Sequence, residues 1–329
     1  MIDSPYQPLD GEQPSMPWLW LGTWSMGGEG FGFCDARESQ KLLESAVEKG
    51  VRHFDTAGFY AHGKSEQLLA NVMRQQRRQL FIASKGGLIW QGRNVHHRAS
   101  AAALRDELQR SLERLRTDYL DLYQLHWPDP NVALEESLEA LQLLQQEGLI
   151  RYWGVCNLSA DQLRTHIPVG AYIPHQVHHN PIHRNDEVLQ VGIQHKRCFN
   201  CCYSPLEQGL LADGVGARGL NSLGKRDVRR SNSYFCSERV RAWLGEYREI
   251  IEASPIDSVT AALLWSVTAA DVQAVVVGPK KLHQLEQMLA HVQWVNCAEG
   301  QLSIKTELTV ADAGRWWQCL ESGADRSVS

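Results

Sequence analysis

The stretch VRHFDTAGFYAHGKSEQLL, Val51 to Leu69, places a short apolar run before a polar turn and a helical pattern. Residues 51–57 predict a buried strand that ends at the carboxylate of Asp55, and residues 65–77 predict a helix. A strand followed at once by a helix is the first part of a βαβ unit, and repeated units build a parallel sheet covered by helices. How often this unit recurs along the chain therefore decides the fold.

The same alternation occurs eight times. The predicted strands cover residues 18–24, 51–57, 80–86, 119–126, 152–157, 175–181, 197–205 and 273–279. The helices after them are expected at 36–49, 65–77, 100–116, 133–147, behind the N-cap Ser159, and at 186–194, 237–253 and 282–292. Eight such units in a chain of this length predict an α/β fold, the closed (β/α)8 TIM barrel.

We expect one domain without an internal boundary. The barrel would cover residues 18–300, after an N-terminal extension (1–17) and before a C-terminal appendix (301–329). Residues 207–235 are rich in Gly, Arg and Ser, and they predict a long loop insertion after strand 7, over one mouth of the barrel.

Composition narrows the class of protein. The chain has 329 residues, a net charge of −5 and a pI of about 6.2. An acidic balance disfavours nucleic acid or an anionic membrane as a partner. We see no signal peptide and no apolar run long enough to span a membrane. Eight scattered cysteines do not suggest a disulfide scaffold, so we expect a cytoplasmic protein.

The active site of such a barrel lies at the carboxyl ends of its strands. Asp55, Lys85 and His126 end three successive predicted strands, and Tyr60 follows Asp55 closely. Alone, Asp55 could be a turn former and His126 a core histidine. A buried Lys85 needs a partner, which Asp55 can supply, and a nearby ammonium should lower the pKa of the Tyr60 phenol. These groups could protonate a carbonyl oxygen, and a hydride from a bound cofactor would complete the reaction.

Six motifs occur in an order that resembles the aldo-keto reductase superfamily from about Trp18 to His291. They are HFDTAGFY (53–60), ASKGG (83–87), YQLHWPD (123–129), GVCNLS (154–159), YSPLEQGLL (203–211) and VVVGPKKLHQLEQML (275–289). The resemblance implies a barrel that binds NADP(H) without a Rossmann fold. It also implies a catalytic tetrad of Asp55, Tyr60, Lys85 and His126, with Tyr60 as the general acid–base.

The resemblance further implies the cofactor contacts. Cys156, Asn157 and Gln176 would hold the nicotinamide carboxamide, and Tyr203 would stack on its ring. The remaining cofactor residues would be Trp24, Ser204, Leu206, Gln208, Leu210, Gly278, Lys280 and Gln284, with Lys280 placed for a 2′-phosphate. Four positions depart from the family pattern, namely Cys156, Ala61, Met288 and Gln287, so NAD stays possible beside NADP.

The predicted partner is a small-molecule carbonyl or alcohol. Trp24, Trp90 and Trp127 lie on the first three mouth loops, and we expect them to line the substrate pocket, although they could also be core residues. GKRDVRR (224–230) is expected to be a solvated loop, with a cofactor clamp or a subunit contact as alternatives. The oligomeric state stays open.

Two other functions compete with a reductase. One is a slow or non-catalytic redox-sensing subunit that binds the cofactor. The other is a metal-dependent hydrolase barrel, suggested by CFNCC (198–202) and HQVHH (175–179). Because strand side chains alternate, Cys198 and Cys202 should share one face and Cys201 the other, which argues against a metal site. We expect no metal.

Overall fold

The structure is a computed structural model that describes residues 19–290, except 29, 33, 75, 93, 213–219, 226, 255 and 269–270, together with residues 318–319. The predicted N-terminal extension (1–17), Trp18 of the first predicted strand and most of the predicted appendix (301–329) lie outside the described residues.

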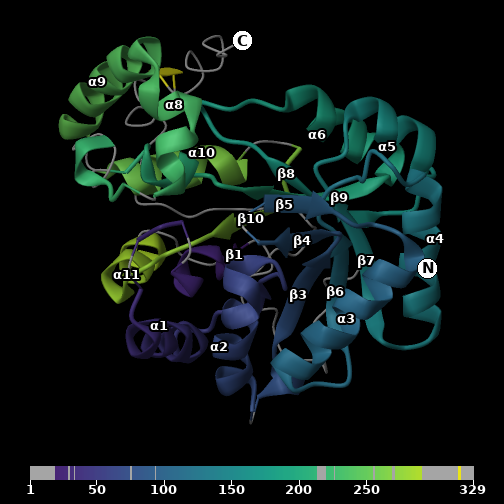
Figure 1. Cartoon of the computed structure of the whole chain (residues 1–329). Coiled ribbons are helices and arrows are strands. Elements are labelled where there is room, and N and C mark those ends of the chain that lie inside the picture. Colours follow the sequence, from purple (N-terminus) through teal and green to yellow (C-terminus); the bar gives the residue numbers. More distant parts are fainter. Residues whose placement is uncertain are drawn as a thin grey trace.

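Eight parallel strands close into a barrel, which confirms the predicted fold (Figure 1). Neighbouring strands follow the order β1, β10, β9, β8, β7, β6, β3, β2 and back to β1. Their bounds are β1 Leu19–Gly22, β2 His53–Asp55, β3 Phe81–Gly86, β6 Leu120–Leu125, β7 Ile150–Cys156, β8 Ile173–His178, β9 Cys198–Tyr203 and β10 Ala274–Val277.

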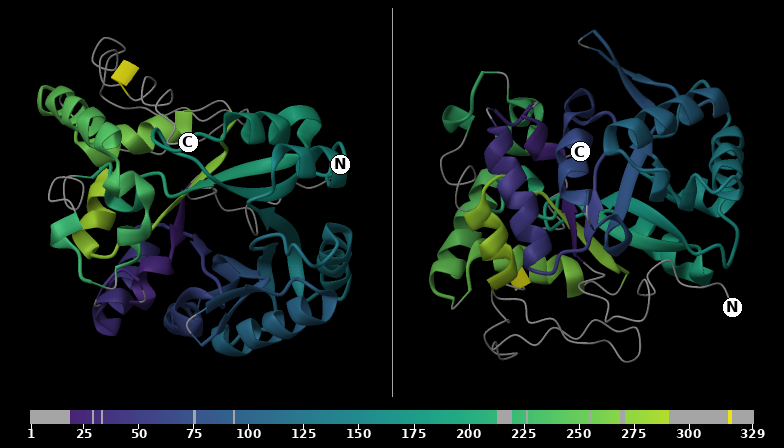
Figure 2. Two further views of the ribbon diagram at one scale, coloured as in Figure 1. Left: turned by 45° about the horizontal axis from the view of Figure 1, so that its top comes forward. Right: turned by 90° about the horizontal axis from the view of Figure 1, so that it is seen from below.

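Helices surround the barrel, as the two further views show (Figure 2). Their bounds are α1 Ala36–Glu48, α2 Lys64–Met73, α3 Ala101–Leu115, α4 Leu134–Gln146, α5 Ala160–His166, α6 Asp186–Ile193, α8 Ser233–Cys236, α9 Glu238–Glu252, α10 Ser258–Thr268 and α11 Leu282–Ala290. Side-chain caps fix several starts, including Asp35 before α1 and Ser100 before α3. The predicted cap Ser159 is confirmed, because it forms a reciprocal capping box with Gln162.

Two buried layers explain why the strands hold their register. The outer layer packs the strands against the helices and includes Leu21, Phe54 and Val155. The inner layer fills the inside of the barrel and includes Trp20, Phe81 and Leu122. At the amino ends of the strands, the rings of His53, Trp20 and Phe81 form a three-membered cluster, with centroids 4.9 to 5.8 Å apart. The lower end of the barrel is therefore filled, and open space occurs at the upper end.

The cysteines of β9 lie as the alternation predicts. Cys198 and Cys202 belong to the outer layer, and Cys201 belongs to the inner one. Successive strand residues point to opposite faces, so these three thiols do not converge.

A hairpin and a long helix were not predicted. An antiparallel hairpin of β4 (Leu88–Gln91) and β5 (Asn94–His97) follows β3 and projects from the body of the molecule (Figure 2, right). The helix α10 packs between α9 and the barrel, and all its residues from 258 to 267 are buried. An apolar helix without a polar face has no amphipathic period, which is why the sequence pattern did not reveal it.

The predicted loop 207–235 is more structured than expected where it is described. It contains the 3-10 turns Glu207–Gly209, Leu220–Ser222 and Val228–Ser231, followed by the short helix α8. Its residues 213–219 and 226 lie outside the described residues.

Candidate active site

Three strands and one turn bring the predicted catalytic side chains together at the upper end of the barrel. Asp55 is the last residue of β2, Lys85 lies near the end of β3, and His126 follows β6 directly. Tyr60 begins the 3-10 turn Tyr60–Gly63 that leads into α2. The rings of Tyr60 and His126 meet edge to face, with centroids 5.8 Å apart.

Lys85 is the centre of this group. Its Nζ donates to Asp55 Oδ1 at 2.6 Å, to the backbone oxygen of Thr56 at 3.0 Å and to Tyr60 Oη at 3.2 Å. An ammonium has three N–H donors, so these bonds use all of them. Because Tyr60 Oη accepts from Lys85, the phenol's own proton can be donated to another molecule.

The pKa of Tyr60 corrects one prediction. Burial raises the pKa of Tyr60 to about 12, although Lys85 pulls it down. The expected net lowering is therefore wrong for the protein without cofactor. Burial is the main cause of the difference, and the Asp55 carboxylate adds to it because it opposes the field of Lys85 at the phenol. Burial also disfavours the Lys85 cation, but Asp55 and Tyr60 outweigh it and raise the pKa of Lys85 above its usual value.

His126 is held as a neutral imidazole. Burial and then the nearby Lys85 ammonium keep its pKa well below the usual 6.5. A neutral ring offers one N–H donor at neutral pH. His126 can therefore donate one hydrogen bond to a substrate oxygen near Tyr60.

A chain of buried amides fixes the other side of Asp55. Gln176 Nε2 donates to Asp55 Oδ2 at 2.5 Å and to Gln124 Oε1 at 3.0 Å. Gln124 Nε2 in turn donates to the backbone oxygen of Val155 at 3.3 Å. Since a carbonyl only accepts, Val155 determines which way both amides face. The side-chain oxygen of Gln176 is thus left free to accept a hydrogen bond. Gln124 was not among the predicted site residues, because nothing in its place in the sequence indicates that it orients Gln176.

The turn that carries Tyr60 is tightly held. Ala61 and His62 adopt left-handed backbone angles, with φ of 48° and 56°, and Gly63 follows at 84°. Arg114 of α3 pairs with the fully buried Glu66 of α2 at 2.5 Å, and its side chain packs against Gly63. The ion pair therefore anchors the start of α2 and the turn before it.

A cavity of about 720 Å³ extends from the tetrad across the barrel mouth. This volume lies within the range of ligand sites. All four tetrad residues line it, and so do most of the predicted cofactor residues, which are Trp24, Cys156, Asn157, Gln176, Tyr203, Ser204, Leu206, Gln208, Gly278, Lys280 and Gln284. Leu210 does not, because it is buried in a separate cluster with α9 and α10.

The polar groups along this cavity are held by one another. Tyr203 Oη donates to Asn157 Oδ1 at 2.8 Å, and Asn157 Nδ2 donates to the backbone oxygen of His126 at 3.0 Å. Burial raises the pKa of the Cys156 thiol to about 12, so the thiol is neutral and can act only as a weak donor. Amide, phenol and thiol groups thus stand together on one wall.

Two segments, residues 30–31 and 228–229, lie side by side at the far end of the cavity, and we call them the strap. Val228 N donates to the backbone oxygen of Gly30 at 2.7 Å, and Lys280 Nζ donates to that of Phe31 at 2.6 Å. Arg229 lines the cavity and lies 5.5 Å from the ring centroid of Phe31. Arg229 therefore contributes to the cavity wall, whereas Gly224, Lys225, Val228 and Arg230 are exposed, as expected for a solvated loop.

Aromatic rings surround the entrance above the tetrad. Trp24 and Trp127 line the cavity, as do Phe31, Phe59 and Leu88, which were not predicted. Trp90 stands behind Phe59 instead of on the wall: their rings stack at 4.6 Å, and Trp90 Nε1 donates to the backbone oxygen of Phe59 at 2.9 Å. Phe59 immediately precedes Tyr60, and that position was the only sequence signal for it.

Among the residues that the structure describes, no group of three or more His, Cys, Asp or Glu side chains is placed to hold a metal ion. Within the same part of the chain, no helix is both long and apolar enough to cross a membrane.

Known proteins resemble the chain over nearly its whole length. Residues 19–301 match the Aldo/keto reductase family. The Bacillus subtilis aldo-keto reductase YhdN is 29% identical over 301 residues, covering 89% of this chain and 90% of that protein. The NADH-specific methylglyoxal reductase of Escherichia coli is 26% identical over 326 residues, covering 92% and 98%.

A solved structure agrees with these relatives. The glycerol dehydrogenase AKR11B4 from Gluconobacter oxydans superposes with a TM-score of 0.78 at 25% identity, covering 98% of this chain and 95% of that one. The family match, the parallel barrel and the lysine-centred group at its mouth agree with one another. The chain belongs to the aldo-keto reductase family and is an oxidoreductase that uses a nicotinamide cofactor to interconvert carbonyls and alcohols.

Proposed function

We propose that the chain reduces a small, uncharged carbonyl compound with NADPH as the preferred cofactor, and that Tyr60 is its general acid–base. The observation that carries this proposal is the pair of bonds from Lys85 to Asp55 and Tyr60 at the floor of the cavity. Such an arrangement holds a phenol beside a fixed cation, where the phenolate formed by proton transfer is stabilised.

In this mechanism each residue has one task. The bound nicotinamide would supply the hydride to the carbonyl carbon. Tyr60 donates its proton to the carbonyl oxygen, and Lys85 stabilises the phenolate that results. Asp55 holds Lys85 in place and keeps it charged. His126, as a neutral imidazole, donates a hydrogen bond that places the oxygen next to Tyr60.

The cavity wall fits a nicotinamide dinucleotide. The carbonyl oxygen of Gln176, the side chain of Asn157 and the Cys156 thiol would hold the carboxamide, and the face of Tyr203 would support the ring. Segment 204–208 offers backbone and side-chain groups for the pyrophosphate. Lys280 and Arg229 place two positive charges at the far end of the cavity, which favours a 2′-phosphate and hence NADPH.

NADH is the alternative cofactor. The methylglyoxal reductase of Escherichia coli, a relative that covers nearly the whole chain, is described as NADH-specific. In the present structure Lys280 Nζ uses one of its three N–H donors for the Phe31 backbone oxygen, which leaves two for a 2′-phosphate if one is bound. The ratio of the two affinities therefore tests the role of Lys280 directly.

The entrance favours an uncharged substrate. Its walls near Tyr60 are the rings of Trp24, Phe59 and Trp127 with Leu88, and the charges at the cavity's other end lie with the expected cofactor. Two relatives are described as a methylglyoxal reductase and a glycerol dehydrogenase, so small carbonyls and polyols are the first compounds to assay.

We also propose a cytoplasmic location and a single domain with boundaries near residues 18 and 300. The seven described cysteines are free thiols, which suits a reducing compartment. A redox-sensing subunit is the second candidate function. The proposed catalytic tetrad of this chain is complete, and a complete tetrad favours an enzyme that turns over.

Fluorescence titration with NADPH and, in parallel, with NADH tests the proposal first. We expect saturable quenching of tryptophan at micromolar NADPH and weaker binding of NADH, with the gap closed by Lys280→Met. Turnover on a panel of aldehydes, ketones and polyols then separates an enzyme from a sensor. Failure of both cofactors to bind would contradict the proposed function.

A further inference from the structure

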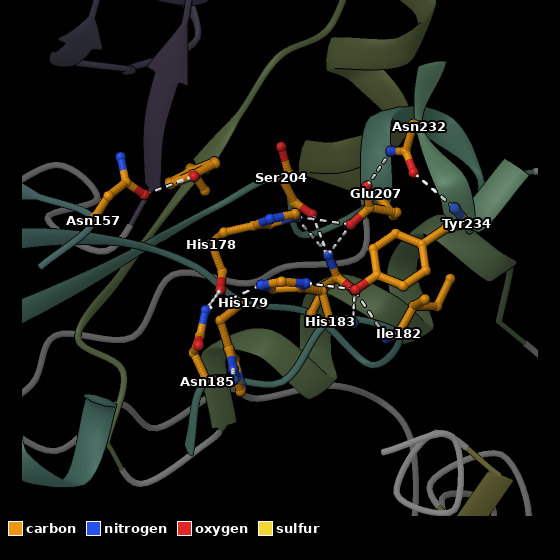
Figure 3. A network of polar contacts seen from close by, with 12 residues as sticks. Asn157, His178, His179, Ile182, His183, Asn185, Ser204, Glu207, Asn232 and Tyr234 are labelled. Atoms are coloured by element: carbon orange, nitrogen blue, oxygen red, sulfur yellow. Dashed lines mark hydrogen bonds and ion pairs between the residues drawn. The ribbon is translucent and has the colours of Figure 1, made fainter. Parts of the chain in front are cut away.

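A buried carboxylate lies directly behind the cavity wall, at the centre of the network in Figure 3. Glu207 is fully buried, and three side chains donate to it. His178 Nε2 lies 2.8 Å and Asn180 Nδ2 2.7 Å from its Oε2, and Asn232 Nδ2 lies 2.8 Å from its Oε1. Burial opposes the charge of Glu207, but these bonds outweigh burial and lower its pKa. Glu207 is therefore a buried anion that only accepts hydrogen bonds.

Glu207 belongs to a backbone segment that would be costly without support. Ser204, Glu207 and Gln208 all have left-handed φ angles, of 54°, 42° and 53°. Such angles in residues other than glycine cost about 1–3 kcal/mol each and persist only where surrounding contacts impose them. Asn180 holds this segment at two points. Its Nδ2 donates to the Glu207 carboxylate and also to the backbone oxygen of Ser204, at 3.0 Å.

The same segment forms the cavity wall. Ser204, Leu206 and Gln208 face the cavity, whereas Glu207 points away from it into the network. The ring of Tyr203 stacks on His178 at 5.1 Å, and His178 stacks on His183 at 4.0 Å. The imidazole that bonds to Glu207 thus also supports the back of Tyr203.

The network also reaches the strap. Asn232 follows the turn Val228–Ser231, whose Val228 bonds to Gly30 across the cavity and whose neighbour Arg229 lines it. Asn232 is in addition the N-cap of α8, because its Oδ1 accepts from Tyr234 N at 3.0 Å. One carboxylate therefore connects segment 203–209 on one wall to the segment that closes the cavity above it.

We propose that Glu207 is a positioning residue for the cofactor: through His178, Asn180 and Asn232 it holds segment 203–209 and the strap in the conformation that binds the dinucleotide. The inference rests on the proposed function, because it concerns the same cavity. It predicts that loss of the Glu207 charge raises the Kd of the cofactor and speeds its release, while proton and hydride transfer in the loaded enzyme proceed at their normal rate.

Glu207→Gln is the principal test, because an amide keeps the shape but presents N–H groups to donors that need an acceptor. We expect the Kd for NADPH to rise about tenfold, as loss of a buried charge-assisted bond should produce. We also expect faster cofactor release in stopped flow. The turnover number at saturating NADPH should stay within about twofold of that of the unaltered protein.

Asp121→Asn is the matched control. Asp121 is equally buried and is paired with Arg77 at 2.7 Å and Arg151 at 3.2 Å, but it lies near the amino end of β6, away from the cavity. It should lower the melting temperature and leave the Kd for NADPH unchanged. If both variants weaken binding in step with their loss of stability, the proposed role of Glu207 is wrong.

Asn232→Ser covers the case in which Glu207→Gln does not fold. Serine can still cap α8, so only the bond to Glu207 is lost. We expect about a threefold rise in Kd with the turnover number unchanged. Unchanged NADPH binding in the variants, beside normal binding by the unaltered protein, would overturn this inference alone. No binding by the unaltered protein would overturn the proposed function and this inference with it.

Discussion

At the scale of single residues, the hydroxyl of Tyr60 is the group on which the proposed chemistry depends. Tyr60→Phe removes only that oxygen, so turnover should fall at least a hundredfold while the Kd for NADPH stays the same, since general acid catalysis contributes about 10²–10⁴-fold. Steady-state assays and the fluorescence titration measure the two effects on one preparation. A variant that keeps full turnover would rule out Tyr60 as the proton donor.

The pKa of Tyr60 gives a second prediction at this scale. Carbonyl reduction needs the protonated phenol, and with a pKa of about 12 Tyr60 stays protonated at lower pH. The rate of reduction should therefore not fall between pH 6 and about pH 10 through this group.

Lys85→Met removes the cation that stabilises the phenolate, so it should abolish turnover. A variant with normal turnover and an unchanged pH profile would contradict that role.

The residue scale also shows where sequence reasoning stops. Asp55, Lys85 and His126 could be predicted because each ends an apolar run, and strand ends meet at one mouth of a barrel. The net pKa of Tyr60 could not, because it depends on how burial balances two opposite charges in space. Gln124 lies inside the run YLDLYQLH, where nothing shows that its amide orients Gln176.

At the scale of elements, the turn before α2 should tolerate no side chain at Gly63. A Cβ there would lie 2.4 Å from Arg114 Cδ, and the φ of +84° disfavours any residue but glycine. Gly63→Ala should cost about 1–2 kcal/mol through the backbone alone and more through displacement of Arg114 from Glu66. Because Tyr60 lies in the same turn, the turnover number should fall about tenfold.

Gly170→Ala is the control for this element. Gly170 has nearly the same φ, +80°, but nothing lies within 4 Å of a Cβ built on it. It should lower the free energy of unfolding by the backbone cost alone, about 1 kcal/mol, and leave turnover unchanged. Urea unfolding and kinetic assays of both variants separate the two contributions. Equal losses of stability would show that Arg114 simply moves aside.

Elements were predictable where their pattern was periodic. The strand–helix units could be located from alternation and caps, and the order of strands followed from the barrel. The helix α10 and the hairpin β4–β5 could not, because one is apolar on all sides and the other is a short exposed ribbon beyond a strand end. The placement of residues 228–232 against the cavity could not be predicted either. It depends on the bond from Val228 to Gly30 and on the bond from Asn232 to Glu207, and these partners are far apart in sequence.

At the scale of the whole molecule, buried histidines should make the barrel sensitive to acid. Burial lowers the pKa of His53, His175, His179 and His183 to about 4 each. In the unfolded chain these groups would titrate near 6.5. Between those values the unfolded state binds protons that the folded state does not, so the free energy of unfolding decreases as the pH falls.

His175 isolates one such group, because it is fully buried in β8. Each histidine should contribute up to about 1.4 kcal/mol per pH unit, fully present above pH 6.5 and lost on the way to pH 4. His175→Gln should therefore reduce the slope of unfolding free energy against pH by about one proton in this window, as measured by urea unfolding at half-unit steps. Val177→Ala changes a buried side chain of the same strand that does not titrate, and it should leave the slope unchanged. If the two variants have equal slopes, His175 does not contribute to the acid sensitivity, and His53, His179 and His183 become the next groups to test.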